Sequence, residues 1–80
     1  MSSYWLDKSK KIVIKIKGIT QKHNISLREL SRLSDVRHAA LSKLQSGKQE
    51  SINFNHIERI AEAMNIKDIR EIIDLVNVED

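Results

Sequence analysis

Two short amphipathic segments with a break between them constrain the fold of this chain more than any other feature. The first begins at Ser26 in an S-x-x-E pattern, in which the serine oxygen can accept a hydrogen bond from the amide of Glu29. The second ends at Gly47, a residue type that favours the left-handed conformation after a helix. Because neither segment is long enough to bury a core by itself, the pair predicts a helix-turn-helix unit, about 26–47, packed on other helices.

Apolar residues recur at helical spacing in both segments and predict which faces are buried. In the first segment the predicted inward residues are Leu27, Leu30, Ser31 and Ser34. The pattern breaks at residues 34–36 and resumes in the second segment, where the predicted inward residues are Ala40, Leu41 and Leu44. The remaining side chains of the second segment must therefore face outward.

The composition restricts the fold class further. The 80 residues form one small domain (1–80), and with no proline and only two glycines little interrupts helices, so an all-α, five-helix fold is predicted. The absence of cysteine excludes a disulfide framework and thiolate metal sites. No apolar run approaches the ~18 residues that span a membrane, and there is no signal peptide pattern, so a cytoplasmic protein is expected.

Charge is distributed unevenly along the chain. Residues 1–48 contain eleven Lys and Arg against three acidic residues, whereas residues 49–80 contain three against eight. This asymmetry suggests that the first half faces a polyanion and that the second half faces away from it.

The N-terminal region is interpreted as a helix that begins between Ser3 and Asp7 and ends near His23. Helical spacing places five residues on one stripe, namely Trp5, Ile12, Ile16, Ile19 and His23. Residues 12–16 also alternate partly with lysine, as a strand would, but a strand leaves both ends of that stripe unexplained. A lysine-rich amphipathic helix is also compatible with an anionic membrane surface, but this narrow apolar stripe is needed by the core.

Two more helices are predicted after the motif. Asn53 is a plausible N-cap, and the inward stripe that follows contains Phe54, Ile57, Ile60, Ala61 and Met64. A fifth helix, about 68–78, is predicted to begin at Asp68 in a D-x-x-E variant of the capping box. Its apolar residues exceed what a five-helix core can bury, so a homodimer interface is predicted to contain Ile69, Ile72, Ile73, Leu75 and Val76.

The segment 25–48 resembles the helix-turn-helix of the Cro/phage-repressor (XRE) class of small transcriptional regulators, and the likeness extends over about residues 12–73. The shared residues are Glu29, Leu30, Ser31, Val36, Leu41, Leu44, Gly47 and Lys48, followed by Ile57, Ile60, Ala61 and Met64. The chain departs from the class pattern at Ser31, where Ala is favoured, and this small residue is expected to matter little. It also departs at Asp35, where Gly is favoured and positive φ is expected, and at Arg37, where a Ser or Thr cap would be usual.

The resemblance implies a lambda-repressor-like fold that binds double-stranded DNA with the second motif helix in the major groove. The positions that match base-contacting residues of the class are Arg37, His38, Ala39, Ser42 and Lys43. Those that match phosphate-contacting residues are Ser26, Leu27 (through its backbone amide), Arg28, Ser46, Lys48, Gln49 and Asn53. Arginine and lysine can donate to guanine, histidine to a purine or a phosphate, and alanine can contact a thymine methyl group.

Three functions fit this pattern. The first is a homodimeric repressor, and the second is an antitoxin that represses its own operon while its apolar C-terminal helix binds a toxin. The third is a protein-interaction domain that has lost DNA binding. The three histidines lie on separate predicted elements, and no Ser-His-Asp set or glycine-rich phosphate loop is present, so no enzyme activity, cofactor or metal site is predicted.

Overall fold

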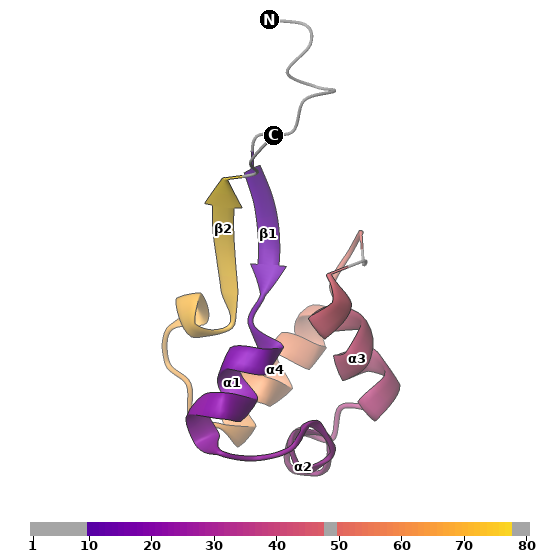
Figure 1. Cartoon of the computed structure of the whole chain (residues 1–80). Helices are drawn as coiled ribbons and strands as arrows, with labels where there is room; N and C mark the ends of the chain where they lie inside the picture. Colours follow the sequence, from indigo (N-terminus) through magenta and orange to yellow (C-terminus); the bar gives the residue numbers. More distant parts are fainter. Residues whose placement is uncertain (1–9, 48–49, 78–80) are drawn as a thin grey trace, which may run out of the picture.

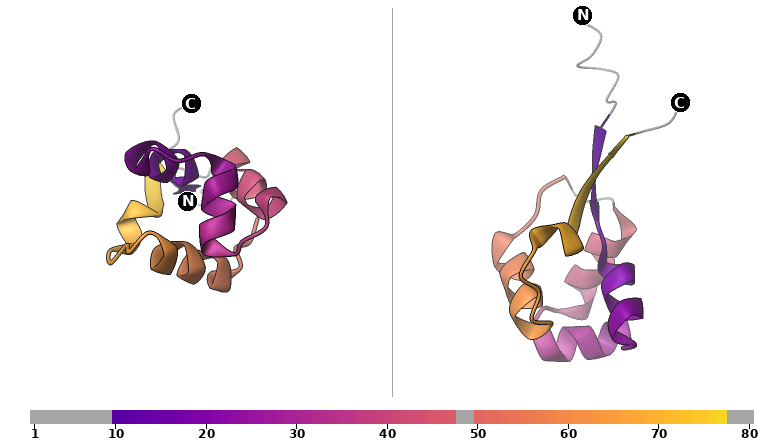
Figure 2. Two further views of the ribbon diagram at one scale, coloured as in Figure 1. Left: turned by 90° about the horizontal axis from the view of Figure 1, so that it is seen from below. Right: turned by 90° about the vertical axis from the view of Figure 1, so that its left-hand side faces the viewer.

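The computed structural model describes residues 10–47 and 50–77, in which four α-helices enclose a core and a two-stranded ribbon projects from them (Figure 1). The helices are α1 (Ile16–His23), α2 (Leu27–Ser34), α3 (His38–Ser46) and α4 (Phe54–Ala63). A 3-10 turn, η2 (Ile69–Glu71), leads into β2 (Ile73–Asn77), which pairs antiparallel with β1 (Lys10–Ile14). β1 and β2 are called the terminal ribbon below, and Figure 2 shows from the side that it extends from one end of the helical body.

The helix-turn-helix motif forms where the sequence predicts it, and its predicted caps are confirmed. The Ser26 hydroxyl oxygen accepts from the amide of Glu29 at 3.0 Å, and Gly47 takes the left-handed conformation at φ 73°. The reciprocal half of the capping box differs, because the Glu29 carboxylate pairs with Arg32 one turn later. Asp35 lies at φ 59°, which confirms that the class position occupied by glycine requires positive φ here too.

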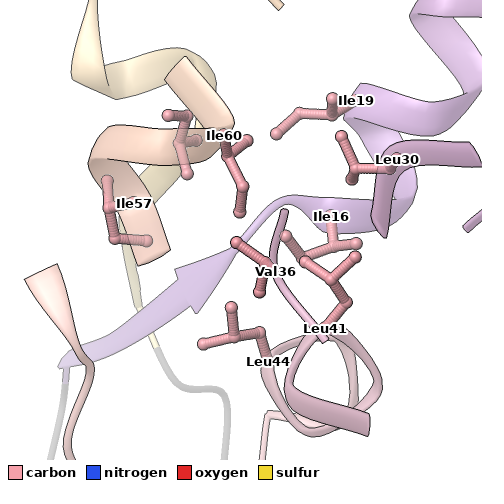
Figure 3. Packing of buried hydrophobic residues seen from close by; sticks show 9 residues of the cluster. Ile16, Ile19, Leu30, Val36, Leu41, Leu44, Ile57 and Ile60 are labelled. Atoms are coloured by element: carbon pink, nitrogen blue, oxygen red, sulfur yellow. The ribbon is translucent and has the colours of Figure 1, made fainter. Parts of the chain in front are cut away.

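The core lies between α1, α2, α3 and α4, and Figure 3 shows its side chains converging from all four helices. Leu30 of α2, Leu41 and Leu44 of α3, and Ile60 of α4 are at most 2% exposed, as their helical spacing predicts. Val36, between α2 and α3, is 1% exposed and fastens the turn of the motif to this core. The buried hydrophobic set is Ile16, Ile19, Leu30, Val36, Leu41, Leu44, Ile57, Ile60 and Ile72.

The predicted first helix is wrong for its N-terminal half. Residues 10–14 form β1, and α1 begins only at Ile16, although Ile16 and Ile19 are buried as the predicted stripe requires. The alternation over residues 12–16 was the correct signal, since β-branched Ile12, Val13 and Ile14 suit a strand. The strand that pairs with β1 lies more than 50 residues away, so no local pattern revealed it; Trp5 lies outside the described residues.

The predicted fifth helix at 68–78 is also wrong. Asp68 does cap a turn, since its carboxylate accepts from the amide of Arg70 at 2.9 Å, but that turn is a single 3-10 turn. The chain then extends as β2, with Ile12 opposite Leu75 and Ile14 opposite Ile73. Pairing with β1 supplies backbone hydrogen bonds that a short helix end would lack, and it outweighs the helical spacing of the isoleucines.

The fold class is therefore corrected from all-α with five helices to four α-helices with a small antiparallel sheet, within the residues that the structure describes. The prediction that Phe54 belongs to the inward stripe of the fourth helix is wrong. Phe54 is the first residue of α4, and its side chain is 78% exposed. Asn53 and Asn65 behave as predicted: Asn53 caps α4 by accepting from the amide of Asn55, and Asn65 has φ 54° just beyond its end.

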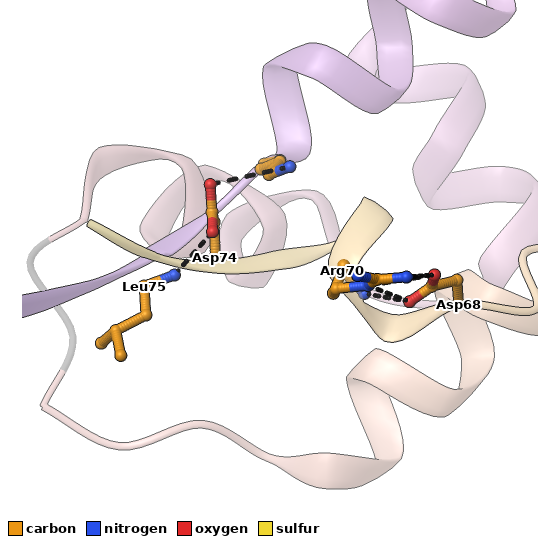
Figure 4. Close-up of polar contacts among 5 residues, drawn as sticks. Asp68, Arg70, Asp74 and Leu75 are labelled. Atoms are coloured by element: carbon orange, nitrogen blue, oxygen red, sulfur yellow. Dashed lines mark hydrogen bonds and ion pairs between the residues drawn. The ribbon is translucent and has the colours of Figure 1, made fainter.

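The terminal ribbon changes the meaning of the charge asymmetry. Lys15 lies 3.9 Å from the Asp74 carboxylate, and Lys22 pairs with Glu71 at 2.8 Å, so acids of the second half meet lysines of the first half. Figure 4 shows Asp74 in β2 beside the start of α1 and the Asp68–Arg70 pair in the adjoining turn. Among the described residues, acids of the second half therefore neutralise two lysines of the first half on this side of the molecule.

Candidate nucleic-acid interface

The outer side of α3 presents the five residues predicted to contact bases. All five are exposed, and they are called the recognition face below: Arg37, His38, Ala39, Ser42 and Lys43. Ala40, Leu41 and Leu44 lie on the opposite side of the helix, where Leu41 and Leu44 are buried. This division follows from helical geometry, since residues 38, 39, 42 and 43 fall on one side of a helix with about 3.6 residues per turn.

The basic side chains and the histidine of the recognition face have no acidic partner among the described residues. Within residues 10–47 and 50–77, neither Arg37, His38 nor Lys43 forms an ion pair, in contrast to Lys15 and Lys22 on α1 and its entry. Binding of a polyanion by these groups would therefore break no ion pair between described residues.

Arg37 occupies the N-cap position of α3 and makes no side-chain cap hydrogen bond. The first intrahelical bond that spans the cap runs from the Leu41 amide to the Arg37 carbonyl at 3.0 Å. The amides of the first turn of a helix have no intrahelical acceptor, so this end of α3 presents donors as well as the Arg37 side chain. The departure from a Ser or Thr cap therefore leaves the start of α3 suited to an anion.

The residues predicted to contact phosphates fall into two groups. Ser26, Leu27 and Arg28 lie together at the N-terminus of α2, where Arg28 is exposed and forms no ion pair with a described residue. Ser26 is engaged as the cap, but its hydroxyl hydrogen can still donate. Leu27 is half-buried, so that only its backbone is suited to a phosphate.

The second group follows α3. Ser46 donates to the Lys43 carbonyl at 2.8 Å, and Asn53 caps α4; both residues are exposed. Lys48 and Gln49 lie outside the described residues, so their contribution remains a prediction from the sequence. The structure therefore brings Ser26 to Arg28 together, and it places Ser46 and Asn53 at the far end of α3 and the start of α4.

Sequence reasoning missed Gln45. It is exposed and lies one turn after Ser42 and two turns after His38, on the edge of the recognition face. A glutamine can pair with adenine through two hydrogen bonds, so its type fits the position. The spacing of seven residues from His38 was the signal available in the sequence.

The linker between α2 and α3, residues 35–37, is held by contacts from two helices. The Ser31 hydroxyl donates to the Val36 carbonyl at 2.6 Å, so this residue does more than replace a small alanine, contrary to expectation. Arg59 of α4 donates through Nη1 to the Asp35 carbonyl at 2.9 Å. Sequence reasoning counted Arg59 only as a charge, because the contact joins residues 24 positions apart and no local pattern marks it.

Two exposed ion pairs, one on α2 and one at η2, shift the pKa values of their members. The side-chain hydrogen bond from Arg32 lowers the pKa of Glu29 on the exposed side of α2, and Glu29 in turn raises the pKa of Arg32. The Arg70 guanidinium, with help from the Arg70 amide, lowers the pKa of Asp68 to about 2. Both carboxylates thus stay ionised at neutral pH and hold their arginines, so neither arginine adds a free cation to the recognition face.

The residues predicted for a dimer interface are divided by the fold. Ile72 is 1% exposed and packs in the core of its own subunit, so it has almost no surface for a partner. Ile69 and Leu75 are 59% and 58% exposed, Val76 is partly exposed, and Ile73 packs against the core. Ile12, opposite Leu75 on the terminal ribbon, is 52% exposed and lies on the same face of the ribbon as Leu75, whereas Val76 lies on the other face.

The described residues hold no other candidate chemistry. No three His, Asp or Glu side chains among them are grouped as metal ligands would be. None of the helices in residues 10–47 and 50–77 has the length and hydrophobicity that a membrane crossing requires.

Comparison with known proteins agrees with this geometry. A family model described as a Cro/C1-type HTH DNA-binding domain matches residues 15–77, which include the motif, α4 and β2. Neither the curated proteins nor the solved structures give a match.

Proposed function

This chain belongs to the Cro/C1-type family of helix-turn-helix DNA-binding domains, and we propose that it is a cytoplasmic, homodimeric transcriptional repressor that reads double-stranded DNA with α3. The observation that carries the proposal is the two-sided character of α3. Its buried side is anchored by Leu41 and Leu44, while its exposed side presents Arg37, His38 and Lys43, none of which has an acidic partner in residues 10–47 and 50–77. A helix anchored in this way can enter a major groove without unfolding the domain.

The recognition face supplies the chemistry for direct readout. Arg37 and Lys43 can donate to guanine O6 and N7, His38 to a purine N7 or a phosphate, and Ala39 can contact a thymine methyl group. Ser42 can donate or accept. Arg28 and the first amides of α2 are proposed to bind phosphate and to fix the angle at which α3 enters the groove. Ser46, Lys48, Gln49 and Asn53 are proposed to bind the backbone on the other side.

A homodimer is proposed because one short helix reads only a few base pairs. Two-fold symmetry then requires an inverted repeat with half-sites about one helical turn, ~10 bp, apart. On one face of the terminal ribbon, Leu75, Ile12 opposite it and the exposed part of Ile73 are the proposed contact between subunits. Val76 on the other face of the ribbon and Ile69 of η2 are proposed to add to it.

Selection of bound fragments from a random pool of duplex DNA tests the proposal. We expect enrichment of an inverted repeat and a log K that falls linearly with log salt concentration, because phosphate contacts release counterions. Enrichment of no sequence would contradict specific readout, and an affinity independent of salt would contradict the phosphate contacts.

An antitoxin is the second candidate, and the same exposed apolar residues favour it. Ile69 and Leu75 would then bind a toxin in place of a second copy. Co-expression with neighbouring genes separates the two candidates: a chain that is monomeric alone and purifies with a small partner supports the antitoxin, whereas a stable dimer alone supports the repressor. The third candidate, a protein-interaction domain that has lost DNA binding, gains no support from the Asp35 departure. Asp35 adopts the positive φ that the turn requires, so the turn of the motif is intact.

A further inference from the structure

Arg59 reaches from α4 to the linker that precedes α3. Its Nη1 donates to the Asp35 carbonyl at 2.9 Å and lies 3.6 Å from the Asp35 Oδ2, so one guanidinium contacts both the backbone and the side chain of the same residue. The contact crosses 24 positions of sequence. It joins α4, which carries no residue of the recognition face, directly to the turn of the motif.

The next carbonyl of the linker is held from the other side. The Ser31 hydroxyl of α2 donates to the Val36 carbonyl at 2.6 Å, and the Val36 side chain is 1% exposed in the core. Two consecutive peptide groups are therefore fixed, one by α4 and one by α2. Because α3 begins two residues later, at His38, the orientation of these peptides sets the direction in which α3 leaves the linker.

The linker needs this support more than a glycine-containing turn with a capped helix would. Asp35 adopts φ 59°, a left-handed conformation that is less favourable for aspartate than for glycine. Arg37 supplies no side-chain cap that could fix the start of α3. Two local devices that ordinarily fix such a turn are missing, and contacts from Arg59 and Ser31 stand in their place.

We propose that Arg59 is a positioning residue for DNA recognition, which acts through the Asp35 peptide to fix the direction of α3 and makes no contact with DNA itself. The proposal rests on the proposed function, because it assumes that α3 reads the operator. It also gives the Asp35 side chain a role: its carboxylate, which stands where the class favours glycine, attracts the Arg59 guanidinium and keeps it near the Asp35 carbonyl. Readout then depends on residues from three helices, although only α3 enters the groove.

Arg59→Met tests the proposal, because it keeps a similar stem and removes the donors. The matched control is Arg70→Met, which removes the same charge from an arginine of η2 that is also ion-paired with a carboxylate. The η2 turn lies beside β2, on the side of the helical body away from α3 (Figure 1). We expect Arg59→Met to weaken operator binding about fivefold, the usual cost of one hydrogen bond, with an unchanged salt slope and nearly unchanged binding to nonspecific duplex. Arg70→Met should change none of these.

Two results would overturn the proposal. Equal operator affinity for Arg59→Met and Arg70→Met would show that the contact does not position α3. A loss shared by nonspecific duplex, with a salt slope lowered by about 1, would make Arg59 a direct phosphate contact instead. Arg59→Lys, which retains a donor and the charge, should recover at least part of the operator affinity and is the variant to use if Arg59→Met does not fold.

Hydrogen exchange of the free protein separates this proposal from the proposed function. Arg59→Met should accelerate exchange of the amides around Leu41 at the start of α3, and Arg70→Met should not. Faster exchange in a protein that binds no operator would leave the Arg59 contact standing and reject the DNA-reading function. Unchanged exchange together with unchanged affinity would reject the Arg59 proposal and leave the proposed function intact.

Discussion

The helix-turn-helix motif and the terminal ribbon differ in the distance along the chain over which their stabilising contacts form. In the motif, the Ser26 cap, the Ser31 hydrogen bond and the Ser34 bond to the Leu30 carbonyl all span five residues or fewer. In the ribbon, Lys10 donates to the Asn77 side chain across 67 positions. The caps and turn contacts of the motif are thus largely local, apart from the Arg59 contact, whereas each strand of the ribbon exists because the other is present.

Burial separates the two regions in the same way. The motif sends Leu30, Leu41 and Leu44 into the core, while Ile12 and Leu75 of the ribbon remain more than half exposed. A two-stranded sheet by itself is marginally stable in water. Under the proposed function, the motif is the anchored platform for DNA, and the ribbon is the region where a second copy would add stability.

Truncation of one leucine in each region should give the largest contrast. Leu41→Ala removes a fully buried side chain from the inner face of α3 and should lower the free energy of unfolding by about 2–5 kcal/mol. Leu75→Ala makes the same change at a side chain that is 58% exposed, so in dilute protein it should cost well under 1 kcal/mol. Urea denaturation at low protein concentration measures both, and equal losses would contradict the division of the molecule into two regions.

Removal of one lysine from the recognition face, compared with removal of one ion-paired lysine from α1, comes next in size. Lys43→Ala should cost about 1–3 kcal/mol of discrimination at one base pair of the operator, because an unpaired lysine on the recognition face is lost. Lys22→Ala removes the same charge from a lysine that pairs with Glu71, and base preference should be unchanged. Competition binding against operators with single substitutions checks this, and a uniform loss across all sequences would remove Lys43 from readout.

Self-association provides the third test. If the ribbon joins two copies, Leu75→Ala should weaken the dimer about tenfold, since burial of a leucine side chain contributes about 1.5–3 kcal/mol and part of this one is already buried. Sedimentation equilibrium gives the dissociation constant. Ala63, at the end of α4, offers a control site: Ala63→Ser should leave the dimer unchanged. A wild-type protein that stays monomeric at high concentration would contradict a dimer through the ribbon.

Loss of a cap should have a moderate effect in the motif. Ser26→Ala should destabilise the protein by about 1 kcal/mol, because the amide of Glu29 loses its acceptor at the start of an eight-residue helix. Asp68→Ala removes a cap from a single 3-10 turn, where fewer residues depend on it, so its effect should be smaller. Thermal denaturation at neutral pH compares the two, and a larger effect at Asp68 would reverse the ranking of the regions.

The smallest expected effect is on the acid stability of the protein, through the Asp68–Arg70 pair. The pKa of Asp68 is lowered to about 2, so its pairing with Arg70 stabilises the folded state at pH values above the ordinary aspartate range and is lost as the pH falls toward 2. Because the pair is exposed, the effect should be slight. Asp68→Asn should remove this part of the pH dependence between pH 4 and pH 2, and identical acid-unfolding curves for wild type and Asp68→Asn would contradict it.

The sequence predicted the motif almost completely because its signals are local. The caps at Ser26, Gly47 and Asn53, the positive φ at Asp35 and the burial of Leu41 and Leu44 all follow from residues within a few positions. The outward exposure of all five residues of the recognition face followed from the same helical spacing. Their contact with DNA is a prediction that binding experiments must test.

The ribbon and the Arg59 contact escaped prediction for one physical reason. Residues 10–14 and 73–77 each fit a helix about as well as a strand, and only their pairing decides between them. Similarly, nothing around Arg59 in sequence indicates that its guanidinium lies beside Asp35. The local sequence pattern around a residue does not indicate which distant residue it will contact in the fold.

Because Lys10 lies opposite Asn77, the two ends of the described chain are neighbours in space. A circular permutant that joins β2 to β1 through a tight turn, with new ends between α4 and η2, where no DNA contact is proposed, would convert the most distant pairing of this domain into a simple hairpin. The permutant should fold faster than the original chain, since its contact order is lower while the core packing is retained. The surface of α3 offered to DNA would be untouched, so speed of assembly and operator choice are separable properties of this chain.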